Sequence, residues 1–293
     1  MGAIFGPAGN SVSFEEKGYS SFSDIPVYVR EMGLFAYEYQ CGRGVKISLK
    51  SASVLGSIAK EYDVTLSLHA PYYISLSSVD EEKRLNSINY ILQSARAANA
   101  MGAERIIVHS GSCGKLSRKD ALLLAKDTLN IAITALKDNG LSHIRICPET
   151  MGKINQLGTL VEVIELCKIS EAFIPCIDFG HLNARTLGGL ADFNDFEDVF
   201  DLIENELGLD RLKELHVHFS KIEYTNGGEK RHLTFKDEIF GPSYEPMCEI
   251  FARKNCSPMI ICESDGTQAE DAKEMMNYYN SYINSMKSME RNG

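Results

Sequence analysis

The sequence predicts one (β/α)8 barrel over residues 1–293, and two observations carry this prediction. Short apolar runs of β-type residues recur roughly every 30 to 40 residues, and a helical stretch follows each. Strands that alternate with helices form βαβ units in a parallel sheet, and eight such units close a barrel. In chain order the runs are AIFG (3–6), LFAYEYQ (34–40), VTLSLHA (64–70), RIIVHSG (105–111), HIRICPET (143–150), FIPCIDFGH (173–181), ELHVHFS (214–220) and PMIICES (258–264).

The helical stretches between these runs are amphipathic and of ordinary length. The clearest cover residues 81–101, 118–137 and 196–206, and a last one at 268–286 follows the eighth run. The sequence contains no linker, low-complexity tract or internal repeat that would divide it. We therefore expect a single domain.

Composition narrows the class of protein further. The chain is 44% hydrophobic and 24% charged, which is typical of a globular protein, and its net charge of −10 argues weakly against nucleic acid. No apolar run reaches membrane-spanning length and the N-terminus lacks the pattern of a signal peptide, so we expect a cytoplasmic protein. The eight cysteines show no CxxC spacing, and we expect free thiols that ligate no metal.

Residues of the types that ligate metals stand at the ends of six consecutive predicted strands. In (β/α)8 barrel enzymes the active site lies at the C-terminal ends of the strands, so these side chains would meet in one pocket. Asp178 and His181 alone would be typical of a helix cap followed by a loop histidine, but the agreement of six strands favours ligands. The residues are His69, His109, Glu149, Asp178 with His181, His216 and Glu263.

The donor set indicates which metals would bind. Imidazoles and carboxylates without a thiolate suit Zn²⁺, with Mn²⁺ or Fe²⁺ as substitutes. Six or more ligands exceed what one tetrahedral ion uses, so we expect two or more ions, with Glu149 or Asp178 as a bridge. Clustered ions of this kind suit the hydrolysis of phosphoesters.

Six segments also resemble the motif series of the endonuclease IV family in order and spacing. They are SLHAPYYISL, IIVHSGS, CPETMGK, CIDFGHLNA, LHVHFSK and ICES, and the resemblance covers nearly the whole chain. Members of that family are zinc-dependent apurinic/apyrimidinic endonucleases on a xylose-isomerase-like TIM barrel. The resemblance thus implies a monomeric enzyme that cuts double-stranded DNA 5′ to abasic sites.

The resemblance implies a role for each matching residue. His69 and His109 would hold a first zinc ion, and Glu149 would be the catalytic bridge to a second. The second ion would be completed by Asp178, His216 and Glu263. A third ion would be bound by His181 and His232.

The chain departs from the family pattern at the third ion and in two loops. Lys230 stands where the family has an aspartate, and Glu229 lies one residue out of register. We expect the third site either to be empty, with Lys230 over the scissile phosphate, or to be rescued by Glu229, and to bind less tightly. The family's His-x-Asn-Asp-x-Lys motif is changed in the seventh run, and YQCGRGVKI (39–47) lacks an Asn-Gln-Arg-x-Trp pattern.

Basic and aromatic residues of the predicted mouth loops would contact the DNA. A basic mouth on an acidic body can hold a phosphate backbone, although loops also collect solvated lysines and arginines. The tyrosines would insert into the base stack or merely pack at the rim. The expected contacts are Tyr72, Tyr73, Arg43, Lys115, Arg118, Arg185, Lys221, Lys230 and Arg231.

Two other functions remain open on the sequence alone. A sugar isomerase or epimerase on the same barrel would need one divalent ion, held by Glu149, Asp178, His216 and Glu263. The additional histidines argue against it, because a single ion does not use them. A metal-dependent nucleic-acid-binding protein without activity is the third reading, and Lys230 is its motivation.

Overall fold

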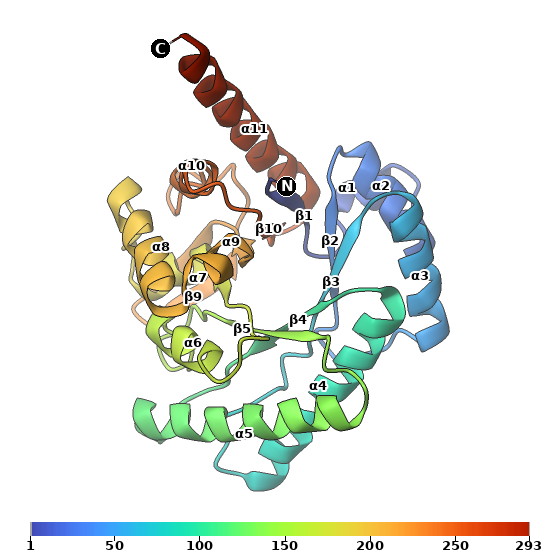
Figure 1. Ribbon diagram of the computed structural model, residues 1–293, viewed down its shortest axis with the longest axis vertical. Helices are drawn as coiled ribbons and strands as arrows, with labels where there is room; N and C mark the ends of the chain where they lie inside the picture. Colours follow the sequence, from blue (N-terminus) through green and yellow to red (C-terminus); the bar gives the residue numbers. More distant parts are fainter. Residues whose placement is uncertain (1, 293) are drawn as a thin grey trace.

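The computed structural model describes residues 2–292 and contains a parallel eight-stranded barrel surrounded by helices (Figure 1). This confirms the predicted fold. The strands neighbour one another in the order β1-β10-β7-β6-β5-β4-β3-β2. Their bounds are β1 Ile4–Pro7, β2 Ala36–Gln40, β3 Thr65–His69, β4 Arg105–His109, β5 Arg145–Glu149, β6 Cys176–Asp178, β7 His216–Phe219 and β10 Met259–Cys262.

The barrel closes between β1 and β2. The backbone N–H of Phe35 donates to the carbonyl of Phe5 at 3.0 Å, and that of Gly9 donates to the carbonyl of Glu38 at 3.0 Å. Gly6 permits this approach, because a Cβ atom there would lie 1.8 Å from the carbonyl oxygen of Ala36. A residue without a side chain is therefore required where the first strand meets the second.

The helices pack on the outside of the sheet in chain order (Figure 1). A short hairpin of β8 (Ile222–Thr225) and β9 (Gly228–His232) follows β7. The helices are α1 Val12–Glu16, η1 Phe22–Asp24, α2 Ile25–Glu31, α3 Leu49–Glu61, α4 Glu81–Met101, α5 Arg118–Asp138, α6 Leu160–Cys167, α7 Phe179–Arg185, α8 Phe193–Leu207, α9 Leu209–Lys213, α10 Glu245–Arg253 and α11 Gln268–Asn292.

Two details differ from the sequence prediction. The sixth strand ends at Asp178, and α7 begins at Phe179, so the end of the run 173–181 is helical. The Asp178 side chain accepts the backbone N–H of His181 and caps this helix, which explains the early end of the strand. The hairpin β8–β9 was not predicted.

The two faces of the strands bury different side chains. Outward residues such as Phe5 and Val217 join the large apolar core under the helices. Inward residues form small apolar clusters, for example Ile107 with Cys147 and Cys176. Because successive side chains of a strand alternate, this pattern fixes which residues at the strand ends face the barrel axis.

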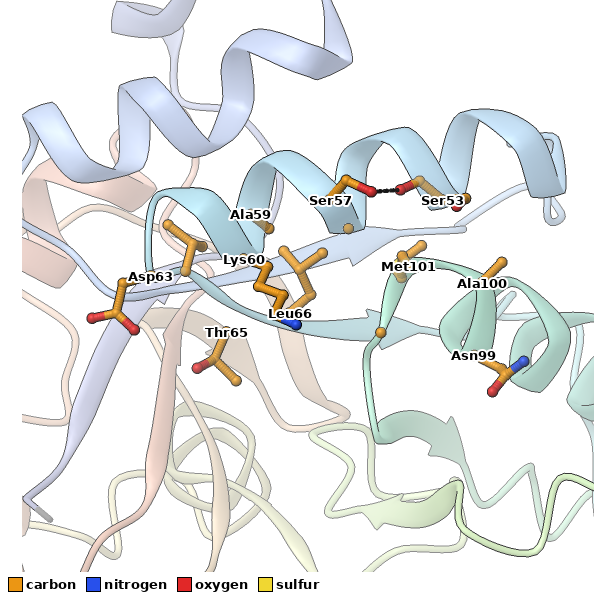
Figure 2. A pocket seen from close by; sticks show the side chains of 13 residues that line it. Ser53, Ser57, Ala59, Lys60, Asp63, Thr65, Leu66, Asn99, Ala100 and Met101 are labelled. Atoms are coloured by element: carbon orange, nitrogen blue, oxygen red, sulfur yellow. Dashed lines mark hydrogen bonds between the residues drawn. The ribbon is translucent and has the colours of Figure 1, made fainter.

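A cavity of about 500 Å³ lies at the opposite end of the strands, between α3 and α4. Figure 2 shows it beside Lys60, Asp63 and Asn99, with Thr65 at the start of β3. It holds none of the predicted ligands, which lie at the other end of the strands.

All eight cysteines lie within the described chain and are buried free thiols. Within residues 2–292, no helix combines the length and the apolar character needed to cross a membrane.

Candidate metal centre

The ends of β3, β4 and β5 bring a first group of donor atoms together. The Nε2 atoms of His69 and His109 lie 3.3 and 3.2 Å from the same oxygen, Oε2 of Glu149. The Nδ1–H of His69 donates to the carbonyl oxygen of Ala70 at 2.8 Å, which leaves Nε2 directed at the carboxylate. His69, His109 and Glu149 could therefore hold one divalent ion.

A second group lies on β5, β6, β7 and just after β10. One donor atom each of Glu149, Asp178, His218 and Glu263 lies within 4.8 Å of the others. Nδ1 of His218 is 3.3 Å from Glu149 Oε1 and 3.5 Å from Glu263 Oε1. Glu149 belongs to both groups and uses a different oxygen toward each, as the predicted bridge requires.

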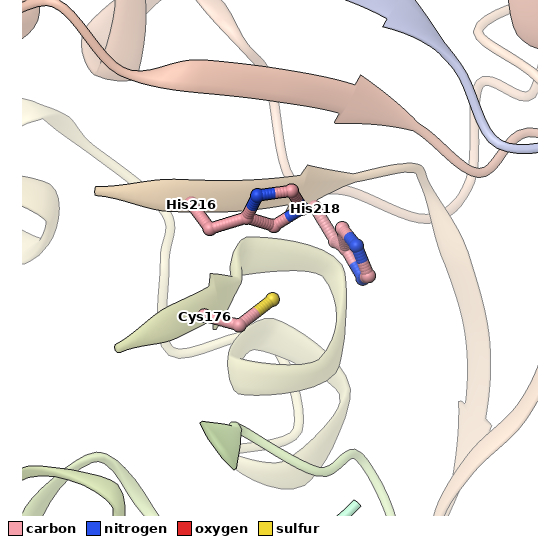
Figure 3. A group of neighbouring side chains, drawn as sticks. All are labelled: Cys176, His216 and His218. Carbon is pink, nitrogen blue, oxygen red and sulfur yellow. The ribbon is translucent and has the colours of Figure 1, made fainter. Parts of the chain in front are cut away.

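His216 does not belong to this second group, although the sequence analysis placed it there. Asp178 is level with His218 in the pairing of β6 and β7, whereas His216 is level with Cys176, deeper in the barrel. Figure 3 shows His218 nearer to the end of the β7 arrow than His216. The strand continues past His216 to Phe219, so its next inward side chain, His218, reaches the mouth instead.

A third group consists of His181, Glu229 and His232. Nε2 of His181 lies 3.5 Å from Glu229 Oε2, and the His181 and His232 rings meet edge to face with centroids 5.5 Å apart. Glu229, and not Lys230, therefore lies beside the two imidazoles with its carboxylate, as the second of the two expected alternatives requires. Lys230 does not lie over the site: its ammonium pairs with Glu223 and its side chain is 54% exposed.

A β-bulge explains how Glu229 reaches this position. In the strand pairing of the hairpin, Glu223 lies opposite Arg231 and Tyr224 lies opposite Glu229. Lys230 is therefore an extra residue that has no residue opposite it in β8. Residues three apart on a regular strand face opposite sides, but one inserted residue returns Glu229 to the side of His232. Lys230, at the position of the aspartate in the endonuclease IV motif, thus turns away from His181 and His232.

The hairpin is also fixed to the loop that follows β5. The N–H of Glu229 donates to the carbonyl of Gly152 at 3.1 Å. The N–H of Ile154 donates to the carbonyl of Gly227, also at 3.1 Å. A Cβ atom on Gly228 would lie 2.2 Å from the oxygen of Gly152. Gly152 and Gly228 therefore allow the backbone of the hairpin to touch the backbone of the loop after β5, and this contact positions Glu229.

Burial and charge show that the three groups fit cations. Burial raises the pKa of Asp178 to about 6, and neighbouring Glu263 and Glu149 raise it as well. Burial also opposes ionisation of Glu149, but His109, His181 and His218 hold its pKa well below the usual value. Oδ2 of Asp178 is buried and accepts no hydrogen bond from the described residues. Such an oxygen, beside two more carboxylates, is an unused ligand atom for a divalent ion.

Members of all three groups line a cavity of about 370 Å³ at the mouth of the barrel, and Asp178 and His218 of the second group lie outside its lining. The donor residues in its lining are His69, His109, Glu149, His181, Glu229, His232 and Glu263. Tyr72, Lys153, Gln40 and Gln156 complete the lining.

Several residues expected to bind DNA have other contacts in the structure. Arg185 donates to the carbonyls of Met151 at 2.9 Å and Lys153 at 3.0 Å, and Arg118 pairs with Glu162 at 2.6 Å. Both arginines therefore hold the loop that follows β5.

The remaining basic residues near the hairpin are also engaged. Lys221 donates to the carbonyls of Phe235 and Asp237. Arg231 pairs with Glu223 at 2.7 Å, beside Lys230. A DNA contact by any of these groups would have to be shared with the present partner.

Other expected contacts remain exposed at the rim. Arg43 and Lys115 are exposed. Tyr72 is 51% and Tyr73 42% exposed, and their rings meet edge to face. Tyr73 also packs against Tyr90, whereas Tyr72 lines the cavity. The role of these residues toward DNA stays a prediction.

The fold and site define an α/β barrel with a metal-ligand cluster at the C-terminal ends of its strands. The family model for xylose isomerase-like TIM barrels matches residues 27–282. The chain therefore belongs to the xylose isomerase-like TIM barrel family.

Relatives include proteins named as endonucleases. An uncharacterized protein of Methanocaldococcus jannaschii is 34% identical over 279 residues, which cover 94% of this chain and 97% of that protein. The probable endonuclease 4 of Mycoplasma genitalium is 30% identical over 210 residues, 69% of this chain and 67% of that protein. The match to probable endonuclease 4 of Mycoplasma pneumoniae is 29% identical and spans 59% of that protein.

Solved structures support the fold and divide between two activities. Endonuclease IV from Thermus thermophilus has a TM-score of 0.66 at 17% identity and covers 90% of this chain and 95% of its own. L-ribulose 3-epimerase has a TM-score of 0.68 at 11% identity, and the match covers 99% of this chain and 97% of the epimerase. A D-tagatose 3-epimerase-like protein has a TM-score of 0.66 at 21% identity, and the match covers 89% of this chain and 93% of that protein. At these identities the likeness shows the fold alone.

The ion pair that holds the loop after β5 leads to a prediction about pH. Burial opposes ionisation of Glu162, but the bond from Arg118 and the N–H groups of Gly158 and Thr159 lower its pKa below the ordinary 4.5. A carboxyl group with a lowered folded-state pKa stabilises the fold above its ordinary pKa and loses this effect as the pH falls through the lowered one.

We expect Glu162→Gln to cost about 1 to 2 kcal/mol of unfolding free energy at pH 7 and progressively less below pH 4.5. Urea unfolding at a series of pH values measures this difference. The exposed carboxylate variant Glu171→Gln is the control and should change little. A cost for Glu162→Gln that is the same at pH 7 and pH 3 would contradict the assignment.

Proposed function

We propose that this chain is a metal-dependent phosphodiesterase of the endonuclease IV type, which cuts DNA 5′ to abasic sites. The observation that carries the proposal is the convergence, within residues 2–292, of three donor groups on one cavity. Glu149 joins the first group to the second. His181 joins the third to both, because its Nδ1 lies 3.1 Å from Asp178 Oδ2 and 3.3 Å from Glu149 Oε1.

The donor set suits Zn²⁺, and Mn²⁺ or Fe²⁺ would fit the same atoms. Ions held there would lower the pKa of a bound water and neutralise charge on a phosphodiester. The protein contributes fixed donors: a backbone carbonyl orients His69, and the Nδ1–H of His181 donates to the carbonyl of Thr150 at 3.0 Å. Glu149 has two oxygens in use toward different imidazoles, so it holds neighbouring sites at a fixed separation.

The DNA substrate would be recognised at the rim of the cavity. Lys153 is exposed on the wall beside Glu229 and is suited to contact a phosphate. Arg43 and Lys115 extend the basic rim. Tyr72 is half exposed and lines the cavity, and it would fill the space of a missing base.

A sugar isomerase or epimerase is the second candidate, and one observation favours it. Glu149, Asp178, His218 and Glu263 alone make a complete site for one divalent ion. The first and third donor groups favour the nuclease, because a single-ion enzyme leaves five further donors without a role: His69, His109, His181, Glu229 and His232.

The two candidates differ in metal content and in what they cleave. We expect the zinc-loaded protein to bind more than one ion per chain and to incise a duplex oligonucleotide at an abasic site. Glu149→Gln should lose activity by several orders of magnitude while remaining folded, since the bridging carboxylate serves two sites. Elemental analysis, gel-based cleavage and circular dichroism measure these quantities.

Glu197→Gln, on the exposed surface of α8, is the matched control and should keep full activity. One ion per chain, together with epimerisation of a ketose and intact abasic DNA, would replace the nuclease by the epimerase.

The bulged hairpin makes a separate prediction about the third site. Glu229→Gln removes a ligand charge beside His181 and His232, so it should lower the affinity for one ion. Lys230→Gln, one residue away, should leave metal content unchanged because Lys230 pairs with Glu223. Competition with a chromogenic chelator compares the two variants. Weaker metal binding in Lys230→Gln than in Glu229→Gln would show that the bulge does not direct Glu229 to the site.

A further inference from the structure

Glu38 is a fully buried carboxylate on β2, below the metal-ligand groups. It is not among the site residues expected from the sequence. Its Oε2 accepts the hydroxyl of Ser67 at 2.8 Å and the Nε2–H of His216 at 2.9 Å. Its Oε1 accepts the side-chain N–H of Gln40 at 3.1 Å and lies 3.0 Å from Nε2 of His218.

The contact with His218 reaches the second donor group. Nδ1 of this imidazole faces Glu149 and Glu263, while Nε2 faces Glu38. Nε2 lies 3.0 Å from Glu38 Oε1 without the angle of a hydrogen bond, and Nδ1 meets Glu149 Oε1 at 3.3 Å. A neutral imidazole carries one proton, and a carboxylate beside Nε2 draws that proton to Nε2, which would leave the Nδ1 lone pair for a metal. His69 and His181 use their nitrogens the other way round. In each, the Nδ1–H donates to a backbone carbonyl and Nε2 faces the donor group.

Glu38 lies beneath two tightly packed imidazoles, His216 and His218. His216 and His218 are both fully buried, and their rings meet edge to face with centroids 5.2 Å apart. Figure 3 shows Cys176 on β6 beside these two imidazoles on β7. Glu38 is the described carboxylate that contacts both rings from below, one with each oxygen. A side chain in this position sets the orientation of His218 and its depth in the barrel.

We infer that Glu38 is a positioning residue of the metal centre, which holds His218 with Nδ1 directed at the ion of the second group. The inference rests on the metal binding proposed above and is independent of the DNA substrate. Glu38 belongs to none of the three donor groups and does not line the cavity, so it would act through the imidazole of His218. Its loss should alter one ion's affinity and coordination.

Glu38→Gln is the informative substitution because it keeps the size and one carbonyl oxygen. The amide has N–H donors on its other side, so one of the two imidazoles must lose its acceptor or move its proton. A proton moved to Nδ1 of His218 blocks ligation. We expect metal affinity, measured by chelator competition, to fall about 10- to 100-fold at one site. The absorption spectrum of the Co²⁺-loaded protein should change with it.

Ser67→Ala is the matched control, because it removes another contact of Glu38 and leaves Oε1 on His218. It should keep the Co²⁺ spectrum and the affinity. If Glu38→Gln does not fold as apoprotein, Glu38→Asp decides the matter: it keeps the charge but is too short to span both rings, so the same loss in smaller measure is expected.

Unchanged affinity and an unchanged Co²⁺ spectrum in the folded Glu38 variant would overturn the inference. An equal loss in Ser67→Ala would also overturn it, since the effect would then belong to the polar layer as a whole. Failure of the nuclease proposal looks different: Glu38 would still control metal affinity in a protein that leaves abasic DNA intact.

Discussion

The crowding of buried carboxylates at one end of the barrel is the constraint on which the rest of the structure depends. Carboxylate oxygens of Glu149, Asp178 and Glu263 lie within 4.8 Å of one another. Glu149 and Asp178 are buried, so water screens their charges little. Carboxylates at such distances repel unless positive charge lies between them. Imidazoles surround the group and supply part of that charge, and Asp178 still keeps a buried oxygen without a donor. Divalent cations would satisfy this arrangement, and in the proposed function they would serve the hydrolysis of a phosphodiester.

Much of this arrangement follows from the sequence. Apolar runs separated by amphipathic helices predicted the barrel, because the fold buries strands on both faces and must cover them with helices. The topology then brings every C-terminal strand end to one place, so His69, His109, Glu149, Asp178 and Glu263 could be grouped without knowledge of a single distance. The fold prediction is confirmed, and these side chains do lie together.

The parts that sequence could not supply depend on register and on contacts between loops. His216 and His218 both face inward, and only the pairing of β6 with β7 shows that His218 is level with Asp178. Glu229 reaches the third group through a bulge, and one extra residue in a strand reverses every face that follows it. Arg185 has the composition of a DNA contact but donates to loop carbonyls. Alternation along β7 could have suggested His218, and the same inward pattern points to Glu38.

Anomalous diffraction from zinc-loaded crystals tests the central claim most directly, because it locates each ion without reference to activity. The account predicts three peaks at the mouth of the barrel: one between His69 and His109, one between Asp178 and His218, and one beside Glu229. A single peak, enclosed by Glu149, Asp178, His218 and Glu263 with the other imidazoles free, would contradict it.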